Sequence, residues 1–501
     1  MRVLFGQCSD PRYPRYVMIV RILLGLILGL ASTSHAFADL VLYNVPGTNL
    51  VFILQGRATV NPGATVTFRH PTFGNLFMNA ADVKIFKVRS VQSQVTNHLN
   101  TAKAAGDLNQ CLEAAREALK IGKLDLFYQA CKAAWEINPN DDRVKKLVEL
   151  KQAIDKPVAI DPAQEKIMRD FTKNRADMKF VRSKHFLLLH DTSDRKDERT
   201  DMTRAQERLE LLETVYESFL MKFCLEGVEL DVPDKLLMVV LFAEHEEYLK
   251  FVTLLGPDLA SAAGFYHRID NVAVFYDQGT DQSFELLNAL NHQLQSDRDE
   301  IRRRKLSGLA DVVRFADTLS LLIEVKRANL DIEVVSHEAT HQLSANTGLM
   351  PGDSPIPVWA AEGLATYFES PKQAAWSGIG AVNAERLEWY RELAPLTKIS
   401  NIDFIVSDQL FTRSANNFTT LHAYGQSWAL THFLMEKHFD KLVAYYRELG
   451  KLPKATHTTP EELQKVFDKV FGKDKTALDK EWRSYMRSLK TDLEKTLAEA
   501  K

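Results

Sequence analysis

Residues 333–343 constrain this chain more than any other part of its sequence. They contain His337, Glu338 and His341 in the spacing HExxH, within a run whose apolar residues recur at helical intervals. Histidines four residues apart project from one face of a helix, so both imidazoles reach the same metal ion. The glutamate between them is placed to take a proton from a water molecule that the metal activates. The sequence therefore predicts a helix that carries most of a metal site, with Glu338 as its general base.

A second helix is expected to complete this site. Catalytic zinc usually has three protein ligands and one open position. Turn-forming residues at 350–357 are followed by a new helical pattern, and an antiparallel pair of helices would bring Glu362 opposite the two histidines. The alternative for Glu362, a solvated carboxylate, is disfavoured because its neighbours are large and apolar: Trp359, Leu364 and Phe368. We therefore expect His337, His341 and Glu362 to bind one zinc ion (Zn2+) per chain.

Together the two segments form a recognisable pair of motifs. HExxH is followed by the pattern WxxEGxAxYF, with twenty residues between His341 and Glu362. This pair resembles the gluzincin clan of zinc metallopeptidases, and within it the peptidase MA-like proteins, among them exported bacterial proteins of the DUF1570 type. The resemblance covers roughly residues 176–495 and is specific to the clan, not to a substrate. It implies an α+β, zincin-like domain with a mixed sheet, an active-site helix and a helical C-terminal subdomain. It also implies that Glu362 is the third zinc ligand and Glu338 the general base.

The same resemblance points to further functional residues. Gluzincins of the aminopeptidase type place a transition-state tyrosine about sixty residues beyond the third ligand, where a phenol donates to the developing oxyanion. Tyr424 lies 62 residues beyond Glu362, although the glycine of the usual motif is displaced. A core tyrosine is an equal alternative, and His422 competes for the role. Apart from the resemblance, Glu369 is either a partner that orients a zinc ligand or a surface carboxylate.

The clan also lays an extended peptide along an exposed edge strand of its sheet. Residues 264–276 resemble that strand, which would bind substrate by adding it to the sheet edge. An ordinary sheet strand is equally compatible with the sequence.

The first 38 residues have the pattern of a cleaved signal peptide. Arg21 precedes an apolar run at 22–31, and Ala36-Phe37-Ala38 follows as a cleavage site. A single membrane anchor is the alternative, but ten residues extend about 15 Å as a helix, half of a bilayer core. We therefore expect an exported protein, periplasmic or secreted, with no membrane span after cleavage.

Export would place the remaining cysteines in an oxidising compartment. Cys111, Cys131 and Cys224 are an odd number, so at least one thiol stays unpaired in a monomer. A bridge between Cys111 and Cys131 and a set of buried free thiols both remain open.

The rest of the chain divides by its periodicity. Residues 39–92 alternate like strands and predict a small antiparallel β module, while 93–155 predict helices that end like a tetratricopeptide repeat. That helical segment is either a surface for a protein partner or a spacer, and fewer than three repeats favour the spacer. Residues 156–175 indicate a linker, and 176–495 the large α+β domain.

The composition of the chain fits a globular protein and gives no indication of nucleic-acid binding. An apolar fraction of 45% fills a globular core, and a net charge of −3 provides no basic stripe for nucleic acid. The sequence thus predicts an exported zinc-dependent peptidase acting on a peptide or protein substrate. The alternative is a non-catalytic secreted binding or scaffold protein that combines a zincin-like domain with a repeat-like interaction segment.

Overall fold

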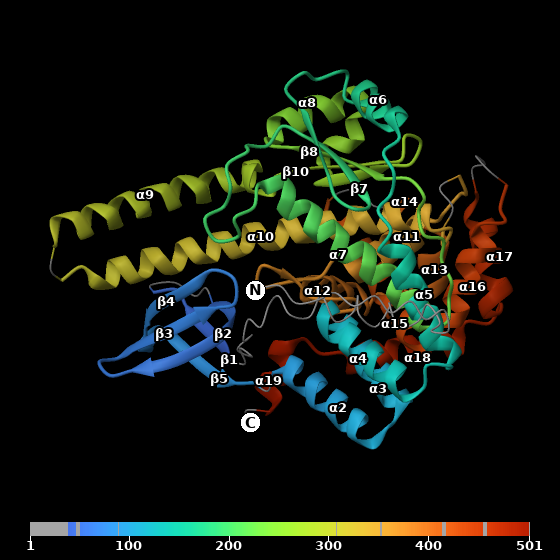
Figure 1. Ribbon diagram of the computed structural model, residues 1–501, viewed down its shortest axis with the longest axis horizontal. Coiled ribbons are helices and arrows are strands. Elements are labelled where there is room, and N and C mark those ends of the chain that lie inside the picture. The colour runs from blue at the N-terminus through green and yellow to red at the C-terminus, as the bar shows by residue number, and fades with distance from the viewer. Residues whose placement is uncertain are drawn as a thin grey trace, which may run out of the picture. The chain divides into compact units, whose positions relative to one another are not determined.

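Five antiparallel strands open the part of the chain that the computed structural model describes (Figure 1). The structure describes residues 39–46, 51–88, 90–306, 308–350, 353–412, 417–453 and 458–499. The predicted signal peptide at 1–38 lies outside these ranges. The sheet has the order β4-β3-β2-β1-β5, formed by β1 (Asp39–Asn44), β2 (Val51–Asn61), β3 (Thr65–His70), β4 (Gly74–Asn79) and β5 (Val83–Lys87). Its alternating buried residues, such as Val66 and Phe68, pack against Leu321 and Leu322 of a later helix, α10 (Ala310–Asn346). The predicted antiparallel β module is confirmed as an N-terminal antiparallel sheet.

Four helices follow this sheet: α2 (Val91–Ala105), α3 (Leu108–Lys120), α4 (Leu124–Ile137) and α5 (Asp142–Ile154). Ser90, Asp107 and Asp141 cap three of them by accepting hydrogen bonds from first-turn amides. Their apolar faces join the same core as α7 (Arg204–Leu225), and Gly122, at φ 64°, leaves no room for a side chain beneath the Trp376 carbonyl. This segment is therefore packed tightly into the rest of the chain.

All three cysteines of the described residues are free thiols: Cys111, Cys131 and Cys224. The bridge between Cys111 and Cys131 that the sequence left open is not formed.

The stretch expected to be a linker contains a helix instead. Helix α6 (Pro162–Phe171) starts at Asp161, whose side chain caps it, and buries Met168 and Phe171 against the second sheet. The side-chain amide of Gln164 donates to the Leu236 carbonyl at 2.6 Å. The prolines of this stretch suggested a linker. Proline is, however, favourable in the first turn of a helix, and Pro162 occupies that position in α6.

The second sheet is mixed and has the order β6-β7-β8-β10-β9. The central strands are parallel, and the two edge strands run antiparallel to their neighbours. The strands are β6 (Lys179–Arg182), β7 (Phe186–His190), β8 (Leu237–Phe242), β9 (Gly264–His267) and β10 (Val272–Tyr276). One face packs on α7 and α10, and the other on α6 and α8 (His245–Leu255). Both faces are covered, which explains why the central strands are almost continuously apolar.

Helix α10 (Ala310–Asn346) carries HExxH and pairs with α9 (Gln282–Arg304). On one side of the motif, Asp331 forms ion pairs with Arg204 and Arg208 of α7. On the other side, the amide of Gln342 donates to the carbonyls of Met238 and Asn271, 2.9 and 3.2 Å away. The motif is therefore held between two anchors to the domain core.

The C-terminal part is helical. It contains α11 (Val358–Phe368), a short hairpin of β11 (Pro371–Lys372) and β12 (Ala375–Trp376), and then α12 (Ala384–Leu393), α13 (Ile402–Val406), α14 (Gln409–Thr412), α15 (Asn417–Lys437), α16 (Phe439–Leu449), α17 (Pro460–Phe471), α18 (Thr476–Ser488) and α19 (Asp492–Glu499). Within the described ranges, no helix combines the length and the apolar character needed to cross a bilayer. The fold is α+β, and the two motif histidines lie on its longest described helix.

Candidate metal centre

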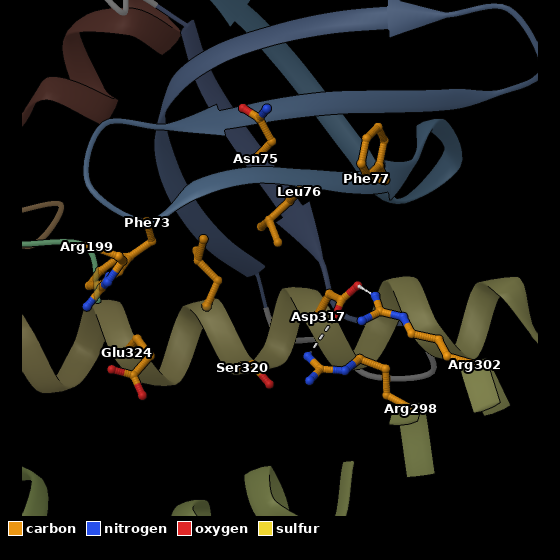
Figure 2. A pocket seen from close by; sticks show the side chains of 11 residues that line it. Phe73, Asn75, Leu76, Phe77, Arg199, Arg298, Arg302, Asp317, Ser320 and Glu324 are labelled. Atoms are coloured by element: carbon orange, nitrogen blue, oxygen red, sulfur yellow. Dashed lines mark hydrogen bonds and ion pairs between the residues drawn. The ribbon is translucent and has the colours of Figure 1, made fainter. Parts of the chain in front are cut away.

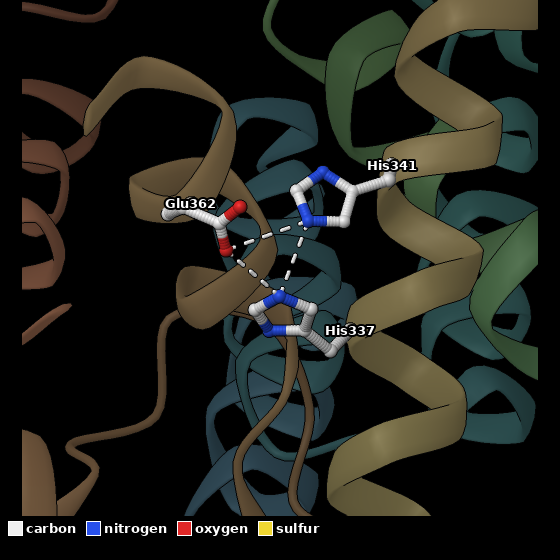
Figure 3. Close-up of side chains that lie close together, drawn as sticks. All are labelled: His337, His341 and Glu362. Carbon is white, nitrogen blue, oxygen red and sulfur yellow. Dashed lines mark hydrogen bonds and ion pairs between the residues drawn. The ribbon is translucent and has the colours of Figure 1, made fainter. Parts of the chain in front are cut away.

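Three side chains converge where α10 meets α11. His337 and His341 lie one turn apart on α10, with their Nε2 atoms 3.1 Å from each other. Oε2 of Glu362, on α11, lies 3.0 Å from His337 Nε2 and 3.5 Å from His341 Nε2. Figure 3 shows the two rings and the carboxylate pointing toward one another. The structure thus brings together the three residues that the sequence grouped as metal ligands.

The spacing of these atoms fits a small divalent cation. Zinc binds imidazole nitrogen and carboxylate oxygen at about 2.0–2.1 Å in tetrahedral geometry, which places neighbouring ligand atoms about 3.3 Å apart. The separations of 3.0, 3.1 and 3.5 Å lie around that value. Two imidazoles and one carboxylate are also a donor set found in catalytic zinc sites. The group can therefore bind a metal.

Glu369 fixes the orientation of the first histidine. His337 Nδ1 lies 2.7 Å from Glu369 Oε2, and Glu369 is completely buried. An ionised carboxylate only accepts hydrogen bonds, so Nδ1 carries a proton and Nε2 is directed toward Glu362. The sequence left open whether Glu369 is a surface carboxylate; the structure instead buries it against His337, a candidate ligand.

The charges of this group favour a positive centre. Burial disfavours the charged form of His337, but its hydrogen bonds to Glu362 and Glu369 outweigh burial and raise the pKa of His337 well above its ordinary value. Burial likewise opposes ionisation of Glu362, yet His341 and His337 hold its pKa below the usual range. Either a protonated imidazole or a divalent cation supplies the charge that these carboxylates require.

Two contacts explain why α11 presents Glu362 here. The carboxylate of Asp408 accepts hydrogen bonds from the Val358 and Trp359 amides, at 2.7 and 2.9 Å, and so caps the first turn. Gly363 lets α11 press against α15, since a Cβ there would lie 2.1 Å from Thr431 Oγ1. The glycine beside the carboxylate in the motif therefore has a packing role.

Glu338 lies between the histidines and the edge of the mixed sheet. It is 7% exposed, and burial raises its pKa despite the opposing effect of His337 and His341. A Cβ added to Gly264 of β9 would come within 3.2 Å of Glu338 Cγ. The backbone of this edge strand therefore passes directly beside Glu338.

Tyr424 and His422 lie in different surroundings. The Tyr424 ring is 6.4 Å from the His337 ring, and the charge of Glu362, followed by burial, raises the pKa of Tyr424. His422 instead contacts α12, with Nε2 3.2 Å from Glu392 Oε2 and its ring 5.1 Å from that of Trp389. Among the described contacts of the two candidates, the ring contact with His337, a candidate ligand, belongs to Tyr424.

The sequence did not indicate Arg386 of α12. Its Nε donates to Glu369 Oε1 at 2.8 Å, and its Nη2 donates to Glu333 Oε1 at 3.2 Å. Glu333 precedes His337 by four residues and therefore shares its helix face, which is a signal that sequence reasoning can use. Arg386 has no such signal, because it belongs to neither motif.

A separate hollow of about 450 Å³ lies between β4 and the α9–α10 pair (Figure 2). Phe73 and Phe77 line it together with Arg298 and Arg302, which both pair with Asp317 at 3.1 Å. None of its lining residues belongs to the His337–His341–Glu362 group.

Residues 331–454 match a family described as a protein of unknown function, DUF1570. The matched segment contains both motifs, Tyr424 and Arg386. Neither the curated proteins nor the solved structures provide a match to this chain.

Proposed function

We propose that this protein is an exported zinc-dependent peptidase that hydrolyses peptide bonds, with Glu338 as general base. One observation carries the proposal: two imidazole nitrogens and a carboxylate oxygen from two helices lie 3.0 to 3.5 Å apart, as tetrahedral zinc ligands do. Export rests on the sequence of residues 1–38 alone.

The ligand residues have separable tasks in this proposal. When bound, zinc supplies a Lewis acid that polarises a carbonyl and lowers the pKa of water to about 7. His337, His341 and Glu362 hold the ion, and Glu369 keeps Nε2 of His337 directed at it through the 2.7 Å bond to Nδ1.

Glu338 is suited to proton transfer because burial raises its pKa toward neutrality. It accepts a proton from the attacking water while the new carbon–oxygen bond forms. It then passes that proton to the amine as the carbon–nitrogen bond breaks, which leaves a carboxylic acid and a free amine. Tyr424 lies close to His337, and in this proposal its hydroxyl donates to the developing oxyanion.

The edge strand beside Glu338 favours a peptide as substrate. β9 is the last strand of the mixed sheet, paired with β10 on one side. Gly264 has no Cβ, which lets α10 and the side chain of Glu338 pack directly against this strand. An extended peptide added to the other edge of β9 would therefore lie close to the general base.

The test is a peptide-library digest with and without a chelator, followed by Glu338→Gln. Glutamine keeps the shape but cannot transfer the proton, so turnover should fall by about 10²–10⁴-fold while zinc and fold are retained. Glu324→Gln, on the same helix but outside the ligand group, is the matched control and should cleave like the wild type.

Undiminished cleavage by a zinc-loaded Glu338→Gln protein would remove Glu338 from the mechanism. A wild type that binds zinc and cleaves no peptide of the library would favour the binding or scaffold alternative.

A further inference from the structure

We infer that Arg386 is a positioning residue for the metal site, acting on His337 through Glu369 and on Tyr424 directly. The inference rests on the proposed function, but it concerns a residue outside both motifs. Arg386 lies on α12, and only folding brings it to α10, α11 and α15.

The first link is the divided hydrogen bonding of Glu369. Its Oε2 accepts from His337 Nδ1 at 2.7 Å, while its Oε1 accepts from Arg386 Nε at 2.8 Å and from Asn383 Nδ2 at 3.2 Å. Because Glu369 is completely buried, these partners determine the rotation of its carboxylate. Arg386 therefore fixes the acceptor that fixes the imidazole.

The second link is charge. Arg386 Nη2 also donates to Glu333 Oε1, so one guanidinium offsets two carboxylates, one four residues before His337 and the other at the end of α11. Removing one partner of a buried ion pair leaves an uncompensated charge, which is strongly unfavourable. Without the guanidinium, Glu369 would no longer be held in the orientation that His337 requires.

The third link is Tyr424. The guanidinium carbon of Arg386 lies 5.4 Å from the centre of the Tyr424 ring, within the range of a cation–π contact. The same ring also has His337 as a neighbour, with the ring centres 6.4 Å apart. The guanidinium of Arg386 thus contacts both Glu369, which orients His337, and Tyr424, the proposed oxyanion donor. Lysine cannot reproduce this geometry, because its ammonium lacks the planar fork and the stacking face.

The experiment compares Arg386→Met, Arg386→Lys and Glu369→Gln in the full chain. The matched control is Arg391→Met, an arginine of the same helix whose partner is Glu494. The readouts are the zinc Kd from chelator competition and the visible absorption of the cobalt(II)-substituted protein, which reports ligand geometry.

We expect zinc affinity to fall about 10–100-fold in Arg386→Met and in Glu369→Gln, with altered cobalt spectra in both. A double variant that combines Arg386→Met with Glu369→Gln should bind zinc no more weakly than Glu369→Gln alone, because Arg386 acts on His337 through that carboxylate. Arg386→Lys keeps the charge and should remain folded, yet it should still lower kcat because Tyr424 loses its stacking partner. The control should match the wild type.

An unchanged zinc Kd and cobalt spectrum in folded Arg386→Met would overturn the inference. If that variant does not fold, Arg386→Lys decides: wild-type kcat and wild-type zinc affinity in it would overturn the inference equally. A wild type that binds no zinc defeats both proposals, whereas a zinc-binding wild type without peptidase activity defeats the proposed function only. In that case the zinc Kd of the variants still tests Arg386.

Discussion

Helix α10 carries two clusters of buried charged side chains that differ in the ratio of guanidinium groups to carboxylates. Around Asp331, the guanidinium groups of Arg204, Arg208 and Arg327 surround two carboxylates, Asp331 itself and Asp277. Six residues later, around His337, the described contacts bring together the carboxylates of Glu333, Glu338, Glu362 and Glu369 with one guanidinium, that of Arg386. Both clusters are buried and hydrogen-bonded, so burial alone does not distinguish them.

The difference is the source of positive charge. In the first cluster, permanent guanidinium charges neutralise the carboxylates, and the cluster anchors α10 to α7 and to the end of β10. In the second, a single guanidinium leaves the carboxylates in excess, and a proton or a divalent cation must supply the remaining positive charge. We interpret the first cluster as structural and the second as the metal site.

The largest expected effect comes from breaking the first cluster. Asp331→Asn should destabilise the fold by about 3–5 kcal/mol, because Arg208 would stay buried with its carboxylate partner gone. Urea denaturation measures this, and zinc stoichiometry should be unchanged. Asp311→Asn, an exposed carboxylate of the same helix, is the control and should stay within about 0.5 kcal/mol. A loss below about 1 kcal/mol for Asp331→Asn would show that the first cluster is not an anchor.

A substitution beside the second cluster should affect catalysis and leave stability unchanged. Tyr424→Phe removes only a hydroxyl beside the second cluster, so kcat should fall roughly 10²-fold while stability and zinc content stay constant. Tyr446→Phe, which removes a buried hydroxyl elsewhere, serves as control. Wild-type kcat in Tyr424→Phe would assign this residue to packing.

Packing against α15 gives a third test. Gly363→Ala should cost about 1–3 kcal/mol, since the added methyl meets Thr431 at 2.1 Å and the gain in helix propensity does not offset that overlap. Zinc affinity should fall with it, because Glu362 is the preceding residue. Gly256→Ala, in open space, should affect neither. Normal stability of Gly363→Ala would mean that α11 and α15 separate easily.

The effect that is smallest at neutral pH, because it develops only as the pH falls, concerns a buried histidine outside both clusters. Burial lowers the pKa of His432 to about 4, so the folded protein binds fewer protons than the unfolded chain between pH 4 and 6.5. His432 therefore contributes a loss of stability as pH falls through that window, up to about 1.4 kcal/mol per pH unit. His432→Gln should flatten the slope in urea titrations at several pH values. An identical slope would contradict the assignment.

The sequence predicted the candidate metal site best, because there side chains that can bind a metal occur at helical spacing. HExxH and the apolar neighbours of Glu362 sufficed to group three candidate ligands, since spacing on one helix and burial on the next are local properties. Their roles in catalysis, and that of Glu338, remain predictions.

Arg386 and the choice between Tyr424 and His422 could not be predicted from spacing, because they depend on how α12 and α15 pack. Helix α6 was missed for a different reason: its burial depends on a sheet that forms from later residues.

The zinc content and zinc Kd of the purified wild type and of Glu362→Ala decide whether the His337–His341–Glu362 group binds zinc. We expect one zinc per chain in the wild type, removed by a chelator, and an affinity more than about 100-fold weaker in Glu362→Ala, beyond the loss expected for a supporting residue. A wild type that stays metal-free after dialysis against zinc, or a Glu362→Ala protein with full stoichiometry and unchanged Kd, would show that this group is not a zinc site.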